Sequence, residues 1–289
     1  MSLAQLKHRV ARLKTQWTPP PMVTTLPPMT ELELWQQAMG TAPDAWQEMV
    51  LKSDDPRICL NCCRQAGKSQ TTAIKAIATA LNEPKSLILL VSRSLRQSGE
   101  LARKVFDAYA VVGRARVPPE SETKQALELA NGSRILALPG GDPEALRGFS
   151  GVRLLCIDEA ARCPDSLWVS LRPMLAVSRG KIILLSTPYG KRGFFYRVWS
   201  QSQRWLKVAV TAEQCPRLTP EFLEEEMIEL GPRWYAQEYL AQFLEAIGQV
   251  FSDESIDRAF LDDIPPLFSD ETDEDAGVLV DLPALFTGA

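Results

Sequence analysis

The segment Cys62–Ser69 constrains the fold of this chain more strongly than any other. It reads Cys-Cys-Arg-Gln-Ala-Gly-Lys-Ser, the phosphate-binding loop pattern with a cysteine in place of its first glycine. The apolar run Arg57–Leu60 before it predicts a buried strand, and apolar residues at helical spacing within Gln70–Leu81 predict a helix after it. A strand, a glycine-containing loop and a helix in this order predict an α/β fold that binds the phosphates of a nucleoside triphosphate.

The loop supplies most of the predicted phosphate contacts. Its backbone N–H groups and the positive end of the following helix would surround the phosphates. Lys68 would reach the β- and γ-phosphates, and the hydroxyl of Ser69 would bind Mg²⁺. Arg64 would contact a phosphate or brace the loop, and an ordinary surface arginine is the alternative. The predicted nucleotide contacts in and beside the loop are Arg64, Gln65, Ala66, Gly67, Lys68, Ser69 and Gln70.

The run Leu154–Glu159 carries the second strong signal. An apolar strand that ends in Asp158 and Glu159 places two carboxylates at the carboxyl edge of a parallel sheet, where ligands bind in such folds. Asp158 is predicted to hold Mg²⁺ through water, and Glu159 to polarise the water that attacks the γ-phosphate. A strand ending in Asp-Glu has no such meaning alone, so the prediction depends on the loop that precedes it in the sequence.

Three further sites are candidates with open alternatives. Ser186, Thr187 and Pro188 end a later predicted strand, where hydroxyl groups can sense the γ-phosphate, although a plain strand-ending turn is equally consistent. Gln47 can form paired hydrogen bonds with an adenine edge, or it can be a surface glutamine. Arg147 could stabilise transition-state charge in its own or a neighbouring subunit, or it could form a structural salt bridge.

The cysteine and histidine content excludes several kinds of site. The chain has six cysteines without regular spacing and one histidine, His8. A zinc site is therefore not expected, and buried reduced thiols of a cytosolic protein are predicted instead. A single histidine also excludes most catalytic schemes that pair a nucleophile with histidine. No apolar run approaches the roughly 20 residues that a membrane span needs, so no membrane partner is expected.

The charge is distributed unevenly along the chain. The sequence has 32 basic and 36 acidic residues, and residues 251–289 hold 11 of the acidic groups and one basic group. The first 250 residues therefore carry 31 basic and 25 acidic groups. A mildly basic body is compatible with a phosphate-backbone partner, and an ordinary solvated surface is an equal alternative. The candidate backbone contacts follow the Ser-Thr-Pro segment and are Lys191, Arg192 and Arg197.

Composition and periodicity divide the chain into five parts. Residues 1–17 are predicted to form a basic amphipathic helix, and residues 18–29 a proline-rich linker. Strands and helices alternate over residues 30–210, which predicts a doubly wound, mostly parallel sheet flanked by helices. Residues 211–248 predict a small helical satellite subdomain, and residues 249–289 an acidic tail or the start of a truncated nuclease domain.

Hydrophobic periodicity places the individual elements. The predicted strands are 57–62, 86–91, 153–158, 181–186 and 205–210. The predicted helices are 31–39, 44–51, 68–82, 95–110, 165–175, 220–230 and 232–244. Residues 125–138 predict a β-hairpin in which Asn131-Gly132 forms a two-residue type I′ turn.

In their order along the chain, these motifs resemble those of the ATPase half of the large terminase subunit of tailed bacteriophages. The resemblance runs over residues 40–255, and the Arg-Gln-x-Gly-Lys-Ser form of the loop is fairly specific to these motors. The matching segments are Pro43–Gln47, Cys62–Ser69, Leu146–Gly148, Leu154–Glu159, Ser186–Gly190, Gly193–Tyr196 with Trp199, and Gly248–Phe251.

The resemblance implies a P-loop NTPase of the additional-strand class, an ATPase motor that uses ATP and Mg²⁺ to package DNA into proheads. It implies Gln47 as the adenine contact, Ser186 and Thr187 as the coupling motif, and Arg147 as a candidate arginine finger. The implied partners are double-stranded DNA, the portal protein, the small terminase subunit and further copies of the chain in a ring. The implied setting is the cytoplasm of a bacterial host, with the gene in a phage or prophage.

One departure from the family pattern concerns the carboxyl end. Large terminase subunits continue into a ribonuclease-H-like nuclease with spaced acidic metal ligands, whereas this sequence stops at Ala289. Asp281 could imitate the first strand of that domain, but the strands with the other ligands are not in this sequence, so no nuclease activity is expected from this chain alone. A catalytically weak nucleotide-binding adaptor or terminase remnant, and another DNA-remodelling P-loop ATPase, are the alternative functions.

Overall fold

The computed structural model describes residues 27–144 and 146–245 of the chain. The chain divides into two compact units, Met1–Ala246 and Ile247–Ala289, and all described residues belong to the first unit. The predicted helix at residues 1–17, most of the linker at residues 18–29 and the acidic tail at residues 249–289 therefore lie outside the described residues.

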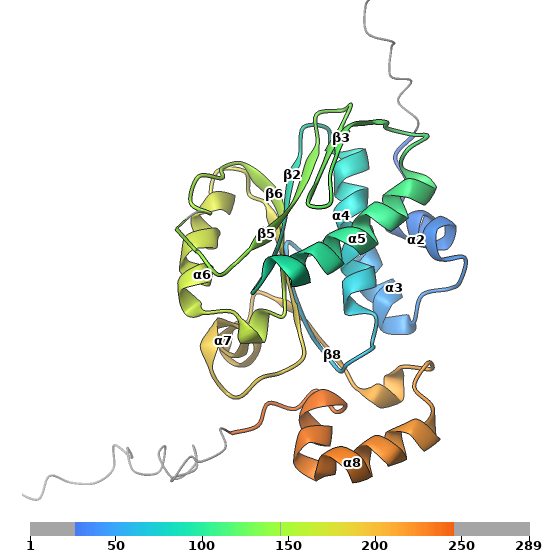
Figure 1. The fold of residues 1–289 in the computed structure, drawn as a ribbon, viewed down its shortest axis with the longest axis vertical. Coiled ribbons are helices and arrows are strands. Elements are labelled where there is room, and N and C mark those ends of the chain that lie inside the picture. Colours follow the sequence, from blue (N-terminus) through green and yellow to red (C-terminus); the bar gives the residue numbers. More distant parts are fainter. Residues whose placement is uncertain (1–26, 145, 246–289) are drawn as a thin grey trace, which may run out of the picture. The chain divides into compact units, whose positions relative to one another are not determined.

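An eight-stranded sheet organises the first unit (Figure 1). Its strand order is β3-β4-β5-β2-β6-β7-β1-β8. All neighbours from β5 to β8 pair in parallel, and β4 pairs antiparallel with both β3 and β5. The strands are β1 (Arg57–Cys62), β2 (Leu87–Ser92), β3 (Pro119–Glu122), β4 (Ala126–Leu129), β5 (Arg134–Pro139), β6 (Val152–Asp158), β7 (Lys181–Ser186) and β8 (Leu206–Val210), with the 3₁₀ turn η3 (Ala212–Gln214) after β8. Because β1, β6 and β7 are parallel, their carboxyl ends lie at one edge of the sheet.

Helices cover both faces of this sheet (Figure 1). One face carries α2 (Glu31–Met39), α3 (Ala45–Lys52), α4 (Lys68–Asn82) and α5 (Leu95–Val112). The other carries α6 (Asp165–Leu171) and α7 (Gly193–Gln201), with the 3₁₀ turns η1 (Ala160–Arg162) and η2 (Arg172–Leu175). Successive strand residues point to opposite faces, so β1 contributes Ile58 and Leu60 to the first core and Cys59 to the second. Among the described residues, no helix is both long and apolar enough to cross a membrane.

The predicted fold class is confirmed, and the five predicted strands lie within one residue of their predicted bounds. Among the described residues, the strand β3 and the α-helix α7 were not predicted. β3 reads Pro-Glu-Ser-Glu at an edge of the sheet, so it has no alternation of apolar and polar residues. α7 begins with Gly193 and two aromatic residues, which are poor helix formers, and it is stabilised by burial of Phe194, Phe195 and Val198.

The hairpin between β4 and β5 is present, but its predicted turn type is wrong. Within the turn only Gly132 has a positive φ, +81°, whereas a type I′ turn needs two such residues. Gly132 donates its N–H to the carbonyl of Leu129 at 2.8 Å. Asn131 instead uses its side chain: Nδ2 donates to the carbonyl of Ala80 at 2.8 Å, and Oδ1 accepts the N–H of Ser133 at 3.0 Å. The asparagine therefore ties the hairpin to α4.

The helical segment after the sheet ends earlier than predicted. Helix α8 (Pro220–Glu238) contains the first predicted helix and the start of the second, joined at Gly231, where φ is +72° and ψ is 164°. The prediction extended the second helix to Leu244. The chain instead turns through Ala241, with φ +53°, whose carbonyl accepts a hydrogen bond from the buried side chain of Asn61 at 2.8 Å. This contact joins the segment to β1 and has no signature in the local sequence.

Candidate nucleotide site

The loop after β1 does not require a glycine at its first position. Cys62 is the last residue of β1, where it pairs with Val210 of β8, and its side chain is fully buried. The N–H group of Cys63 still bonds with β8, and that of Arg64 bonds with the end of α8. Cys63 donates to the carbonyl of Val210 at 2.8 Å, and Arg64 donates to the carbonyl of Glu238 at 2.9 Å. The cysteine that replaces the first glycine is therefore part of the strand and of the core.

Gly67 is the glycine on which the loop depends. Its φ is +92°, and a Cβ at this position would lie 2.6 Å from Nε2 of Gln47. Gln47 is buried, and its Oε1 accepts the N–H of Asp44, the residue that precedes α3, at 2.8 Å. The predicted adenine contact therefore lies against the loop, outside the set of residues that line the pocket described below.

Arg217 braces the loop from the segment after β8. Its guanidinium donates to both carboxylate oxygens of Asp44, at 3.0 and 2.7 Å, and to the carbonyl of Ala66 at 3.0 Å. The hydrogen bond with Asp44 raises the pKa of Arg217, so the guanidinium stays charged. Arg217 thus joins three segments: the start of α3, the loop and the chain beyond β8.

These segments surround a pocket of about 560 Å³. Four cationic side chains and one carboxylate line it, so its field favours an anion. The lining residues are Arg64, Gln65, Ala66, Gly67, Lys68, Ser69, Gln70, Lys104, Glu159, Thr187, Arg217 and Leu218. All seven residues that the sequence predicts as nucleotide contacts in and beside the loop are among them.

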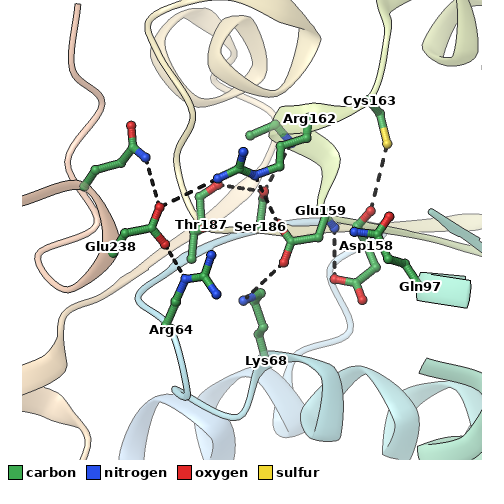
Figure 2. A network of polar contacts seen from close by, with 12 residues as sticks. Arg64, Lys68, Gln97, Asp158, Glu159, Arg162, Cys163, Ser186, Thr187 and Glu238 are labelled. Carbon is green, nitrogen blue, oxygen red and sulfur yellow. Dashed lines mark hydrogen bonds and ion pairs between the residues drawn. The ribbon is translucent and has the colours of Figure 1, made fainter. Parts of the chain in front are cut away.

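The two carboxylates after β6 have different surroundings. Asp158 is buried, and this burial, together with the neighbouring charge of Glu159, raises the pKa of Asp158 to about 6. Glu159 has a left-handed backbone with φ +51°, an uncommon conformation that marks a strained position for a residue other than glycine. Its Oε1 lies 3.8 Å from Nζ of Lys68 (Figure 2). Lys68 and Glu159, both predicted to act at the γ-phosphate, therefore meet at this pocket.

A charge network extends from Glu159 to the end of α8 (Figure 2). Arg162 of η1 lies 4.0 Å from Glu159 and 3.7 Å from Glu238. Glu238 also accepts from Nε of Arg64 at 2.5 Å and from Nε2 of Gln237 at 3.0 Å. Burial opposes the charge of Glu238, but the hydrogen bonds outweigh it and lower the pKa of Glu238. A largely buried, charged glutamate therefore holds the arginine of the loop.

Ser186 and Thr187 connect the end of β7 to the segment after the carboxylates. Oγ of Ser186 accepts the N–H of Ala161 in η1 at 3.2 Å and donates to the carbonyl of Thr187 at 2.7 Å. Both side chains are buried, and Thr187 lines the pocket. Pro188 follows directly. The predicted coupling residues therefore lie between the pocket and α7, which begins a few residues later.

Arg147 does not reach this pocket within the chain. Its exposed side chain pairs with Glu144 at 2.9 Å. It lines a separate pocket of about 460 Å³ together with Phe149, Val169 and Met174. Among the described residues nothing places Arg147 beside Lys68, and its predicted role in a neighbouring subunit stays a prediction.

Comparison with known proteins identifies the family. Residues 59–258 match the family model described as "Terminase large subunit, T4likevirus-type, N-terminal". The chain belongs to the terminase large subunit family. Over 226 residues it is 26% identical to the large terminase subunit of Escherichia phage T5, which corresponds to 73% of this chain and 50% of that protein. This terminase chain thus spans half the length of that relative.

Three solved structures share the terminase fold at low sequence identity. The ATPase domain of the Thermus phage P74-26 large terminase has a TM-score of 0.61 and 20% identity, over 75% of this chain and all of that one. The large terminase of bacteriophage HK97 has a TM-score of 0.57 and 12% identity, over 74% of this chain and 55% of that one. A large terminase from a thermophilic bacteriophage, in complex with ADP, has a TM-score of 0.59 and 16% identity, over 70% of this chain and 54% of that one.

The sheet of this terminase chain has the strand order of a known class of nucleotide-binding proteins. Strand β7 stands between β1, which leads into the loop, and β6, which ends in the two carboxylates. This insertion is the arrangement of the additional-strand class of P-loop NTPases, so the class that the resemblance implied is confirmed.

The surroundings of Asp158 in this terminase chain are suited to a cation. Asp158 is 8% exposed, and among the described residues no cationic side chain lies within ion-pair distance of it. A cation beside Asp158 would relieve the burial cost that raises the pKa of this carboxyl group. Ser69, at the start of α4, lines the nucleotide pocket, whereas Asp158 does not. The Mg²⁺ site of Ser69 and Asp158 therefore stays a prediction.

Sequence analysis did not identify four residues of the terminase site: Lys104, Arg162, Arg217 and Glu238. Arg162 had a weak signal, since it follows the carboxylate pair within one turn of chain. The contact between Glu238 and Arg64 joins residues 174 positions apart, and that between Arg217 and Asp44 joins residues 173 apart. Periodicity and local motifs do not report such distant partners.

Proposed function

We propose that this chain is the ATPase motor of a terminase and couples ATP hydrolysis to the movement of double-stranded DNA into a phage prohead. The observation that carries the proposal is the convergence of Lys68, Glu159 and Thr187 on one cationic pocket at the carboxyl edge of the sheet. Phosphoryl transfer depends on positioning and on neutralising charge, and these groups supply both.

Each group of the site has a proposed role. The loop amides and Lys68 bind the triphosphate and hold its γ-phosphate toward Glu159. Glu159 orients the attacking water and accepts its proton. Ser69 and Asp158 hold Mg²⁺, which neutralises phosphate charge when it is bound. Gln47 contacts the adenine from beside the loop.

Coupling to movement is proposed to run through the strand ends. Ser186 and Thr187 join the pocket to η1 on one side and to α7 on the other. Glu238 joins the loop to α8, so a change at the phosphates reaches the helical segment. In this scheme residues 30–210 form the ATPase domain, and residues 211–248 the helical linker subdomain.

The proposed assembly is a ring of copies that acts with a portal protein and a small terminase subunit in the cytoplasm of a bacterial host. Arg147 is exposed and lies away from the nucleotide pocket of its own chain, which supports a role at the nucleotide pocket of a neighbouring subunit. Charge stabilisation by an arginine supplied in trans is worth large rate factors in related phosphoryl-transfer sites.

The first test is ATP hydrolysis by the purified chain, with and without linear double-stranded DNA and portal. We expect turnover that is raised by DNA or portal and abolished by Lys68→Ala. Glu159→Gln should keep nucleotide binding and lower turnover by about 10²- to 10⁴-fold, because only the water-activating group is lost.

Two outcomes would contradict the proposal. Unchanged hydrolysis in Glu159→Gln would remove Glu159 from its role. Tight ATP binding without turnover under every condition would favour the alternative of a nucleotide-binding adaptor.

A further inference from the structure

A second pocket opens at the same edge of the sheet as the nucleotide pocket. Its volume is about 690 Å³. Its lining comes from the segments that follow β2, β5, β6 and β7. The lining residues are Arg93, Gly140, Gly141, Ala161, Arg162, Cys163, Pro164, Asp165, Tyr189, Arg192 and Gly193.

The charges of this second pocket do not balance. Three arginines, Arg93, Arg162 and Arg192, face a single acid, Asp165. Asp165 is already engaged, because it accepts the N–H of Phe194 at 2.7 Å and pairs with an arginine outside the pocket lining at 2.9 Å. Within residues 27–144 and 146–245, neither Arg93 nor Arg192 has an ion pair of 4.0 Å or less. The pocket therefore carries uncompensated positive charge and favours an anion.

The structure separates the three basic residues that the sequence offered as DNA contacts. Lys191 pairs with Glu245 at 3.4 Å, and Arg197 pairs with Asp165 at 2.9 Å. Arg192 pairs with no acid of the described chain, and its guanidinium lies over the ring of Tyr189 at 5.3 Å. Of the three, only Arg192 lines the pocket.

Tyr189 orients the arginines and limits what can bind. The guanidinium of Arg162 lies 4.1 Å from the centre of the Tyr189 ring, and that of Arg192 lies 5.3 Å from it. Stacked guanidinium groups are held in plane, which suits them to the oxygens of a phosphate. Because the guanidinium groups of two arginines lie over the ring of Tyr189, little of its surface is left for a nucleotide base to stack on. The site therefore suits a phosphodiester backbone better than a free nucleotide.

Arg162 connects this pocket to the nucleotide pocket. It lies 4.0 Å from Glu159 and 3.7 Å from Glu238, both longer than a well-formed charged hydrogen bond. A phosphate in the second pocket would compete with these carboxylates for the same guanidinium. Drawing Arg162 away would leave Glu159 free to act on water.

We propose that the pocket between Arg93, Arg162 and Arg192 binds a backbone phosphate of double-stranded DNA, and that Arg162 reports this binding to Glu159. The inference rests on the proposed function, in which DNA is the partner. It adds the place where the backbone is held and the residue that links DNA to hydrolysis.

The test is DNA binding by the full chain, measured by fluorescence anisotropy over a salt titration without ATP. The loss of one phosphate contact should make the negative slope of log K against log salt less steep by about 0.9 and weaken binding by roughly tenfold at 0.1 M salt. We expect both effects in Arg192→Gln and in Arg93→Gln. Arg197→Gln, on the same helix as the pocket rim and already paired with Asp165, is the matched control and should leave the slope unchanged. Thermal unfolding shows that each variant is folded.

A second measurement tests the link through Arg162. At low salt and saturating DNA, the ratio of ATP turnover with DNA to turnover without DNA should fall toward one in Arg192→Gln and stay at the wild-type value in Arg197→Gln. An unchanged ratio in Arg192→Gln would overturn the link.

The outcomes separate this inference from the proposed function. One outcome is that turnover depends on Lys68 and DNA binds, but Arg192→Gln and Arg197→Gln have equal salt slopes. In that case the second pocket does not bind DNA, and the proposed motor function is unaffected. If ATP competes with DNA in Lys68→Ala, the pocket takes nucleotide and the inference is overturned. Turnover that persists unchanged in Lys68→Ala would instead contradict the motor.

Discussion

At the scale of single residues, exposure gives two adjacent carboxylates different chemistry. Asp158 is 8% exposed, and burial raises its pKa to about 6. Glu159 reaches the pocket, where it faces Lys68 at 3.8 Å and Arg162 at 4.0 Å. A buried carboxylate without an ion pair suits a metal ion, whereas the carboxylate that reaches the pocket can accept a proton from water.

Asp158 should destabilise the metal-free protein above pH 6. Its pKa in the folded state, about 6, exceeds the ordinary value of 3.8. The free energy of unfolding therefore falls as the pH rises from 3.8 to about 6. Asp158→Asn removes the buried charge, and its amide oxygen can still accept the N–H of Glu159. We expect Asp158→Asn to raise the free energy of unfolding at pH 8 by up to about 3 kcal/mol and to change it little at pH 4. Urea unfolding in EDTA measures this, and a variant less stable than wild type at pH 8 would contradict the account.

At the scale of elements, the end of α8 is joined to the loop it braces. The carbonyl of Glu238 accepts the N–H of Arg64, and its carboxylate accepts Nε of the same residue at 2.5 Å. The chain after α8 continues along the sheet, where Asn61 holds Ala241 and Phe243 packs against the rings of α7. One segment therefore touches both the loop and the helix after the coupling residues.

Glu238→Gln should weaken this junction in a pH-dependent way. Because the pKa of Glu238 is lowered from 4.5, its contribution is present above pH 4.5 and is lost as the pH falls below that value. The side chain of Arg64 is 59% exposed, so solvent screens the pair, and we expect a loss of about 1 kcal/mol in the free energy of unfolding at pH 7. Glu229→Gln, on the exposed part of α8, is the control and should change stability by less than about 0.5 kcal/mol. If the two substitutions change the free energy of unfolding equally at pH 7, the contact of Glu238 with the loop does not stabilise the protein.

At the scale of the whole described unit, two pockets lie at the carboxyl edge of the sheet, one lined by the residue before η1 and the other by η1 itself. The nucleotide pocket contains Glu159, and the second pocket contains Arg162 from the next turn of chain. The pocket of Arg147 lies apart from both. A site that needs Arg147 would therefore be completed between copies of the chain.

Mixing experiments test completion by a neighbour. Arg147→Ala and Glu159→Gln should each abolish DNA-stimulated hydrolysis, and an equal mixture should recover about a quarter of the wild-type turnover, because a quarter of sites would combine an intact Glu159 with an intact neighbouring Arg147. A mixture of Glu159→Gln with Lys68→Ala should recover nothing, since both residues act in their own subunit. Hydrolysis by Arg147→Ala alone at the wild-type rate would remove the arginine from the mechanism.

The predictable part of this protein is the part in which neighbouring residues carry the signal. The loop at Cys62–Ser69, the strand that ends in Asp158 and Glu159, and the alternation of strands and helices followed from spacing alone, and the loop residues do line one pocket. The β-hairpin was predictable, but its turn was not, because Asn131 bonds with Ala80 on α4 instead of adopting a left-handed backbone.

Tertiary structure alone decided which distant groups meet. Glu238 and Arg64 are 174 positions apart, and the choice of partner depends on where α8 returns to the sheet rather than on any local pattern. The same holds for Arg217 and Asp44, and for Arg192, which the sequence could not distinguish from Lys191 or Arg197. Short-range periodicity determines which residues are buried in an element, whereas the pairing of charges between elements is set only when the packed core fixes their positions.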